Sequence, residues 1–300
     1  MNRPELPLLN GLSVDVEDWF QVGAFERVID PADWDSLPSR VEDNCARILD
    51  LFAQAGVSAT FFTLGWIARR HPHLIRRIHE AGHEVASHGM AHARVFTLGP
   101  RGFSADLRES TRILEDAAST PIRGYRAPSF SIDARTPWAF EILAAHGFAW
   151  SSSVAPVVHD HYGWREAPRF AFRPLVGHAF VEVPVTTAEW AGRRFAAGGG
   201  GFFRVLPYAF SAAAIRQVNS RERRPAVFYF HPWEIDPGQP RIAAPLRSRL
   251  RHYSRLGAME GKLGRLLRDF RWGRMDAVAA AEARQADFLT LMIEPQAHAT

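Results

Sequence analysis

The sequence predicts an α/β protein with a mainly parallel sheet that is covered by helices and closed, or nearly closed, as a barrel. Apolar runs of strand length alternate with segments whose apolar residues recur at helical spacing. Hydrophobic residues make up 47% of the 300 residues, which is enough for a large buried core. Several strand-like runs end at a carboxylate or an imidazole, and α/β enzymes build their sites at such strand ends.

Apolar periodicity and helix-ending residues predict the elements of the first half. Residues 8–16 form an apolar run that ends in acidic residues, which is typical of a buried strand. Ser39 and Glu42 have the spacing of a capping box, and they predict the start of a helix that ends at Gly56. Further strands are expected at residues 57–64, 84–87 and 121–125, and further helices at residues 66–80 and 104–117.

The second half begins with the same alternation and then departs from it. Residues 155–210 are rich in Pro, Gly and aromatic residues, and we interpret them as an elaborated loop region near the site. After Pro240 the chain becomes basic and helical. We therefore expect residues 1–240 to form the barrel and residues 241–300 to form a helical C-terminal extension packed on the same domain. Helices are expected at residues 135–146 and 213–217, and strands at residues 148–152, 181–185 and 226–230.

Charge and cysteine content narrow the partners. The net charge is 36 − 32 = +4, and arginines gather at residues 221–224 and 247–274. A solvated helix face explains such clusters, and an anionic membrane surface or a phosphorylated glycan carrier is the alternative. No RNA- or DNA-binding motif accompanies the charge, so a nucleic-acid partner is not expected. Cys45 is the only cysteine, which excludes an intrachain disulfide and a cysteine metal site.

The sequence also carries expectations about location. No secretory signal is visible at the N-terminus, and no apolar stretch reaches the ~18 residues of a membrane span. We expect a cytoplasmic protein, with peripheral contact with a membrane or a lipid-linked glycan as the alternative. The oligomeric state stays open.

A histidine pair suggests a metal site. His88 and His92 begin where a strand stops, and one helical turn between them would point both imidazoles at one ion. Thirteen histidines in 300 residues give about half of one such pair by chance, so the pair is weak alone. Surface or core histidines are the alternative.

An acidic segment strengthens the metal interpretation. Asp15, Glu17 and Asp18 lie close together, which is costly unless they are solvated, protonated or neutralised by a cation. On a regular strand Asp15 and Glu17 face the same side, and Asp18 faces away unless the strand has ended. One carboxylate and two histidines would make a three-ligand site with an open position for water, as in catalytic zinc sites. An ordinary strand-to-loop junction is the alternative.

Two further segments carry residues that suit hydrolysis. His231 follows the apolar run 226–230, and a histidine there supports another side chain or acts as a general acid. Arg126 follows a short strand, and Pro128 restricts the backbone beside it. An arginine next to an acidic site usually neutralises or orients a carboxylate. A structural turn residue is the alternative for both.

The order of Ser13-Val-Asp15, His88-xxx-His92, Arg126-Ala-Pro128 and His231-Pro232 resembles the motifs of the NodB-type polysaccharide deacetylases, carbohydrate esterase family four. More narrowly, residues 15–20, 124–131 and 231–237 are similar to those of exosortase-associated exopolysaccharide deacetylases. The resemblance runs from about residue 8 to 270. It implies a deformed (β/α)₇-type barrel and one divalent metal held by a carboxylate and two histidines. Zinc is the expected metal, with cobalt or nickel as alternatives.

The resemblance also implies an activity and a role for each matching residue. The activity is metal-dependent removal of N-acetyl groups from the amino sugars of a polysaccharide or its precursor, in exopolysaccharide biosynthesis. Asp15 would be the base, Arg126 would orient it, and His231 would be the acid. His88 and His92 would be metal ligands.

Two residues, Glu17 and Asp18, are candidates for the carboxylate ligand. The common pattern has two adjacent aspartates, whereas here Glu17 shares the face of Asp15 and Asp18 is the chemically matching residue. Asp18 is slightly favoured as the ligand. The residues expected to line the substrate cleft are Glu17, Trp19, Pro128, Ser129 and Trp233.

Two positions depart from the family pattern. Ser129 stands where the pattern has a tyrosine. Ser151 stands where many relatives have an aspartate that pairs with the arginine, which leaves Arg126 in need of another partner. Two rival functions stay open. One is an amidohydrolase acting on a small cyclic amide or ureide, as in the allantoinase-like relatives of this superfamily. The other is an inactive glycan-binding member of the fold, which the departure at Ser151 suggests.

Overall fold

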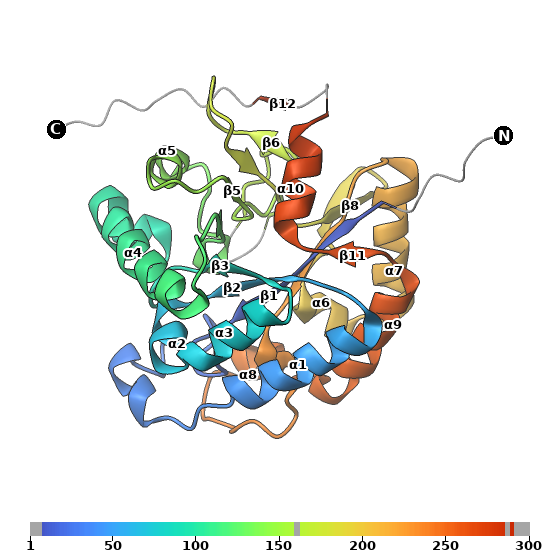
Figure 1. The fold of residues 1–300 in the computed structure, drawn as a ribbon. Helices are drawn as coiled ribbons and strands as arrows, with labels where there is room; N and C mark the ends of the chain where they lie inside the picture. The colour runs from blue at the N-terminus through green and yellow to red at the C-terminus, as the bar shows by residue number, and fades with distance from the viewer. Residues whose placement is uncertain (1–7, 159–162, 286–288, 291–300) are drawn as a thin grey trace.

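A curled, mainly parallel sheet forms the centre of the computed structural model, which describes residues 8–158, 163–285 and 289–290 (Figure 1). Seven parallel strands follow the order β10-β1-β2-β3-β4-β5-β7, and the antiparallel β6 continues the sheet beyond β7. The edge strand β12 pairs with β6, and β11 pairs with β1. The strands are β1 (Asn10–Val16), β2 (Thr60–Thr63), β3 (Glu84–Ser87), β4 (Gly124–Tyr125), β5 (Trp150–Ser151), β6 (Phe172–Arg173), β7 (Val181–Glu182), β8 (Thr187–Trp190), β9 (Arg193–Ala196), β10 (Val227–Phe230), β11 (Trp272–Gly273) and β12 (Leu289–Thr290).

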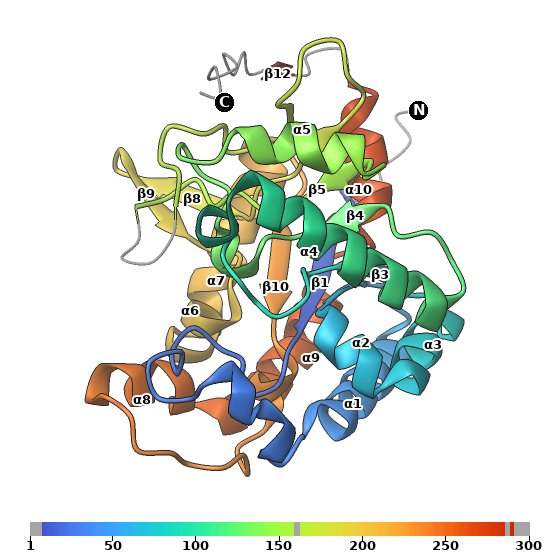
Figure 2. The same cartoon turned by 90° about the vertical axis from the view of Figure 1, so that its left-hand side faces the viewer.

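Helices pack around the outside of the sheet, as Figures 1 and 2 show from two sides. Their apolar faces and the strands share one large buried core. This arrangement confirms the expected deformed (β/α)₇-type barrel, here as a half-barrel. The helices are α1 (Val41–Ala55), α2 (Gly65–Arg70), α3 (Pro72–Glu80), α4 (Val95–Ala118), α5 (Trp138–Ala145), α6 (Gly200–Val205), α7 (Tyr208–Arg216), α8 (Leu246–Tyr253), α9 (Met259–Asp269) and α10 (Met275–Ala283).

Two helices differ from the ranges expected from the sequence, and proline and glycine residues explain why. The helix expected at residues 66–80 is two helices, because Pro72 starts α3 and cannot continue the ladder of α2. The helix expected at residue 104 begins at Val95 and is kinked at Gly99, which has a φ of 64° and precedes Pro100. None of the helices within the described ranges is long and apolar enough to cross a membrane.

A glycine-rich segment bridges the gap between β7 and β10. The Tyr229 amide donates to the Gly198 carbonyl at 2.8 Å, and the Val227 amide donates to the Thr186 hydroxyl at 2.6 Å. A Cβ on Gly198 would lie 2.3 Å from the Val227 carbonyl oxygen, and one on Gly200 would lie 2.4 Å from Glu234 Oε1. The glycines at these positions therefore let the chain approach β10 closely.

Gly198→Ala should destabilise the protein by about 1–3 kcal/mol, because the added methyl group overpacks against fixed backbone. Gly201→Ala is the matched control, since a Cβ there meets nothing within 4 Å and alanine favours a helix by about 0.5–1 kcal/mol. Urea unfolding of both variants measures the difference. Equal stability of the two variants would contradict the bridging role of Gly198.

Candidate active site

The carboxyl ends of four parallel strands bring the chemistry-bearing residues together. Glu17 directly follows β1, His88 follows β3, Arg126 follows β4 and His231 follows β10. These strands point the same way in one sheet, so the residues after them meet at one edge.

Glu17, His88 and His92 form a cluster with the spacing of a metal site. One ligand atom from each lies within 4.8 Å of the others. The two imidazole rings are 5.5 Å apart. The expected helical turn between the histidines is absent from this described segment, because Gly89 has a φ of 76° and His92 a φ of 55°. A left-handed loop, not a helix, brings the two rings together.

His88 is held as a neutral imidazole. Its Nδ1–H donates to the Arg126 carbonyl at 2.8 Å, which leaves the lone pair of Nε2 available. Burial lowers the pKa of His88 to about 4, and the neighbouring Asp15 only partly offsets this. The imidazole is therefore unprotonated at neutral pH, as metal binding requires.

Glu17 provides the carboxylate of the cluster. Its Oε2 lies 3.0 Å from His92 Nε2 but has no partner with hydrogen-bond geometry, and it is buried. Its Oε1 lies 3.4 Å from His231 Nε2. Burial alone would raise the pKa of Glu17, but His92 and His231 outweigh it and lower the pKa to about 2. The buried Glu17 Oε2 therefore converges with the imidazoles of His88 and His92 on one place, where a bound cation would satisfy the carboxylate oxygen.

Asp18 has a different role. Its carboxylate accepts hydrogen bonds from the Ser39 hydroxyl at 2.7 Å and from the amides of Arg40, at 2.8 Å, and Val41, at 3.2 Å. Asp18, which lies far from α1 in the sequence, therefore caps the start of that helix. The Ser39 hydroxyl donates to Asp18 and does not form the expected capping box. Glu17 and not Asp18 lies with the two histidines, so Glu17 replaces the slightly favoured Asp18 as the proposed carboxylate ligand.

Arg126 and Asp15 form a buried ion pair, with 2.6 Å between Arg126 Nη1 and Asp15 Oδ1. The guanidinium also donates to the Ser13 hydroxyl at 2.8 Å and to the carbonyl and hydroxyl of Ser152, each at 2.9 Å. It lies 4.0 Å from the centre of the Phe62 ring. These contacts fix the Asp15 carboxylate beside the cluster.

A glutamate on β7, Glu182, lies beside Ser151, the residue that stands where many relatives have an aspartate. The Ser151 hydroxyl donates to Glu182, whose Oε1 accepts from the Ser153 and Val154 amides, both at 2.8 Å. Glu182 is fully buried, and burial raises its pKa to about 7. It anchors the segment from which Ser152 binds Arg126. The signal in the sequence was an acidic residue inside the apolar strand expected at 181–185.

The side chain of His231 is held by the buried Glu234, which is itself held by the buried Arg204. Its Nδ1 lies 2.8 Å from Glu234 Oε1, and Glu234 Oε2 accepts from Arg204 Nε at 2.6 Å. Burial disfavours the charged form of His231, but Glu17 and Glu234 outweigh it and raise the pKa to about 9. The imidazole therefore carries a proton at neutral pH. Sequence reasoning did not assign roles to Glu234 and Arg204.

The two tryptophans expected in the cleft are covered. Trp19 is buried, and its indole N–H donates to the Pro38 carbonyl at 3.0 Å. Trp233 is stacked between the rings of His231, at 5.1 Å, and His252, at 4.2 Å. Their side chains are only 1% and 7% exposed, so this packing gives no support to the expectation that they line the substrate cleft.

The expected Pro128 and Ser129 lie beside the site. Pro128 starts a short 3-10 turn, η2 (Pro128–Phe130), directly after Arg126 and Ala127. Ser129 and Phe130 both have left-handed backbone, with φ of 53° and 48°. Such strain in consecutive residues is common at functional sites.

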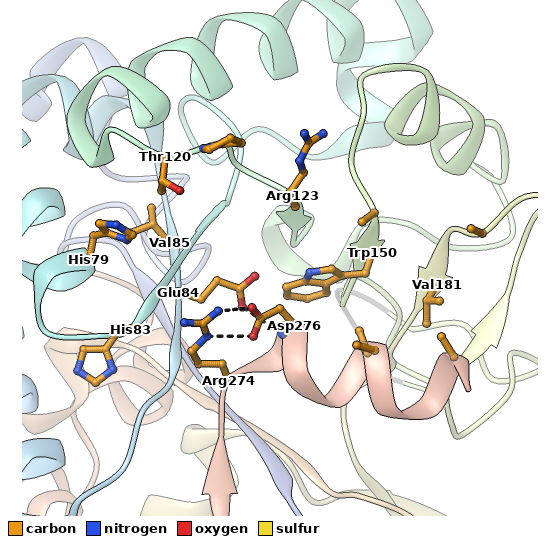
Figure 3. Close-up of a pocket in the computed structure, with 16 residues that line it drawn as sticks. His79, His83, Glu84, Val85, Thr120, Arg123, Trp150, Val181, Arg274 and Asp276 are labelled. Carbon is orange, nitrogen blue, oxygen red and sulfur yellow. Dashed lines mark hydrogen bonds and ion pairs between the residues drawn. The ribbon is translucent and has the colours of Figure 1, made fainter. Parts of the chain in front are cut away.

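A separate cavity of about 480 Å³ lies at the opposite end of the sheet (Figure 3). Glu84, Trp150 and Val181, the first residues of their strands, line it together with the Arg274–Asp276 ion pair. Burial raises the pKa of Glu84 to about 8. The amino ends of barrel strands usually serve stability, and this cavity shares no residue with the cluster.

Two family models match the chain in succession. Residues 33–149 match the polysaccharide deacetylase family, and residues 152–280 match a domain of unknown function, DUF3473. The first match contains His88, His92 and Arg126, whereas the second contains Glu182 and His231.

Curated relatives cover part of the chain. It is 39% identical over 82 residues to a chitooligosaccharide deacetylase of Sinorhizobium fredii, which is 27% of this chain and 38% of the relative. It is 32% identical over 130 residues to a chitooligosaccharide deacetylase of Bradyrhizobium sp., which is 43% of this chain and 53% of the relative. The chain thus spans about half or less of the length of these relatives.

Solved structures share the fold over most of the chain. A crystal structure of an inferred polysaccharide deacetylase from Mycobacterium smegmatis has a TM-score of 0.63 at 21% identity, over 98% of this chain and 99% of that one. An allantoinase has a TM-score of 0.59 at 15% identity, over 91% and 89%. At these identities the likeness concerns the fold.

Fold and strand-end cluster together define an α/β barrel protein with a histidine–carboxylate site. Residues 33–149 resemble the polysaccharide deacetylase family, and the relatives that match part of the sequence include chitooligosaccharide deacetylases.

The raised pKa of Glu182 leads to a prediction about stability and pH. The folded protein holds the Glu182 proton up to about pH 7, whereas the unfolded chain releases it near 4.5. The stabilisation is therefore complete below pH 4.5 and lost as the pH rises through 7. Glu182→Gln lacks this dependence, and between pH 5 and 8 it should gain on the order of 2 kcal/mol relative to the wild type. Urea unfolding at both pH values measures it, and parallel pH profiles would refute the assignment.

Proposed function

We propose that this protein is a metal-dependent N-deacetylase that removes acetyl groups from the amino sugars of a polysaccharide or its precursor. One observation carries the proposal: Glu17, His88 and His92 converge, and the buried Glu17 Oε2 lies 3.0 Å from His92 Nε2 without hydrogen-bond geometry. The narrower assignment, to exosortase-associated exopolysaccharide deacetylases, is supported by the motifs at residues 15–20 and 231–237. The cytoplasmic location stays a prediction.

The residues present suit a divalent cation with nitrogen and oxygen ligands, and we propose zinc. Two neutral imidazoles and one ionised carboxylate are the donor set of many catalytic zinc sites. When bound, such a cation acidifies a water molecule and polarises the acyl oxygen of an amide. The lowered pKa of both Glu17 and His88 keeps the two side chains in the form that binds a cation.

Asp15 serves as the base in this proposal. Its carboxylate lies beside the cluster, and Arg126 Nη1 holds its Oδ1 at 2.6 Å. Because the Arg126 guanidinium is also fixed by Ser13 and Ser152, the carboxylate cannot rotate away from a water molecule at the cluster. Asp15 takes the proton of that water as it attacks the acetyl carbonyl.

His231 serves as the acid. Glu234 binds Nδ1, so the Nε2–H points toward Glu17 and the cluster. The pKa of His231, raised to about 9, keeps this proton available at neutral pH. Its transfer to the sugar nitrogen lets the amine leave and releases acetate. Acetate release from N-acetylglucosamine oligomers, with and without chelator, tests the proposal.

The rival functions predict other outcomes of the same assay. An allantoinase-like amidohydrolase would open a ureide ring and release no acetate from the oligomers. An inactive glycan-binding member would bind the oligomers without turnover and without added effect of metal. The likeness to an allantoinase concerns the fold and does not favour a small cyclic substrate.

A matched pair of variants tests the carboxylate ligand. Glu17→Gln should weaken zinc binding by more than about 100-fold, because even the partners behind metal ligands contribute about 10–100-fold. Asp18→Asn should keep zinc binding and lose about 1–2 kcal/mol of stability, since the helix cap is weakened. Calorimetric zinc titration and urea unfolding separate the two effects. The reverse pattern would make Asp18 the ligand.

His231→Gln should lower turnover by about 10²–10⁴-fold, the usual contribution of a general acid. Glu234→Gln should instead move the alkaline limb of the pH–rate profile to lower pH, because it removes a charge that raises the pKa of His231. The profile of kcat/KM between pH 6 and 10 measures the shift. An unchanged alkaline limb in Glu234→Gln would remove His231 from the acid role.

A further inference from the structure

Helix α8 presents an apolar ridge between arginines. Leu246 is 69% exposed and Leu250 is 58% exposed. At about 100° per residue, these leucines lie about 40° apart around the helix, with Arg247 and Arg251 on one flank and Arg249 on the other. We name these five residues the leucine–arginine face.

The segment that contains α8 carries charge of one sign. Residues 237–259 contain five arginines and no Asp or Glu. This local excess is larger than the +4 of the whole chain, so the rest of the protein is close to neutral. A merely solvated helix face usually mixes both signs and carries no pair of exposed leucines.

The opposite side of α8 is fixed to the protein. His252 is buried between the rings of Phe25, at 4.5 Å, and Trp233, at 4.2 Å. The Arg204 guanidinium donates to the carbonyls of Arg251, His252 and Ser254 at 3.1, 2.9 and 2.7 Å. The leucines therefore cannot turn inward, and the helix keeps them facing away from the core.

We propose that the leucine–arginine face docks on an anionic lipid bilayer. Exposed apolar side chains on a short surface helix enter the boundary between headgroups and acyl chains, and guanidinium groups bind lipid phosphates beside them. Both features are present, and acidic side chains that would repel the surface are absent from residues 237–259. A surface that binds a soluble polyanion would need the arginines but would not need the exposed leucines.

The same contacts set the orientation of the docked protein. Trp233 stacks on His252 of α8 and also on His231 of the candidate site. Figure 2 shows α8 at the end of the molecule toward which β10 runs. Docking would bring the site end of the barrel to the bilayer. Such docking goes beyond the proposed function and does not depend on the reaction.

Vesicle co-sedimentation tests the proposal. The wild type should bind phosphatidylcholine vesicles that contain about 30% phosphatidylglycerol, and not pure phosphatidylcholine, at low salt. Arg249→Gln with Arg251→Gln should weaken binding by about 25-fold, since each arginine contributes about fivefold. Leu246→Ser with Leu250→Ser should also abolish most binding. Val176→Ser, at a position 69% exposed elsewhere on the surface, should bind like the wild type.

Three outcomes would overturn the proposal: no binding, equal binding to neutral vesicles, or full binding by the double serine variant. The last would indicate a surface for soluble polyanions. All substituted side chains are exposed, so thermal unfolding should match the wild type and exclude misfolding as the cause.

A fluorescent label tests insertion directly. Cys45 is fully buried, and burial raises the pKa of its thiol far above the ordinary value, so it should not react with a thiol label. An environment-sensitive dye on Leu250→Cys should shift to shorter wavelength with anionic vesicles, whereas the dye on Val176→Cys should not. An unchanged Leu250→Cys spectrum at saturating vesicle concentration would contradict insertion.

Discussion

The geometry of the site depends on one buried cation, the guanidinium of Arg126. Its side chain joins Ser13 and Asp15 of β1 to Ser152 beyond β5, and its backbone carbonyl accepts a hydrogen bond from His88 Nδ1–H. A buried charge without its partner costs about 3–5 kcal/mol, so the arrangement is strongly specified. One residue thus fixes both the carboxylate proposed as the base and the tautomer of a proposed ligand.

The site is assembled from residues that precede both family matches and from residues within each of them. Asp15 and Glu17 precede residue 33, and His88 lies in the polysaccharide deacetylase match at 33–149. His231 and its partner Glu234 lie in the match to a domain of unknown function at 152–280. That second region also supplies Gly198, which bridges the sheet to β10. In this chain it completes the barrel and the site, and its boundaries cross residue 240, where we expected an extension to begin.

The sequence predicted those parts that follow from strand direction. Parallel strands carry their carboxyl ends to one edge, so the convergence of Glu17, His88 and His231 could be expected from apolar runs alone. Contacts between side chains that are distant in the sequence could not be predicted in this way. Asp18 caps a helix that starts 23 residues later, at Val41, and Glu182 reaches Ser151 from a neighbouring strand. Both depend on packing between elements, which local patterns do not encode.

The most direct test is anomalous diffraction from crystals grown with zinc. The proposed site predicts one peak at about 2.0–2.2 Å from a carboxylate oxygen of Glu17 and from imidazole nitrogens of His88 and His92. Asp18 should keep its hydrogen bonds to the start of α1. A peak coordinated by Asp18, or no peak at a saturating zinc concentration, would contradict the account.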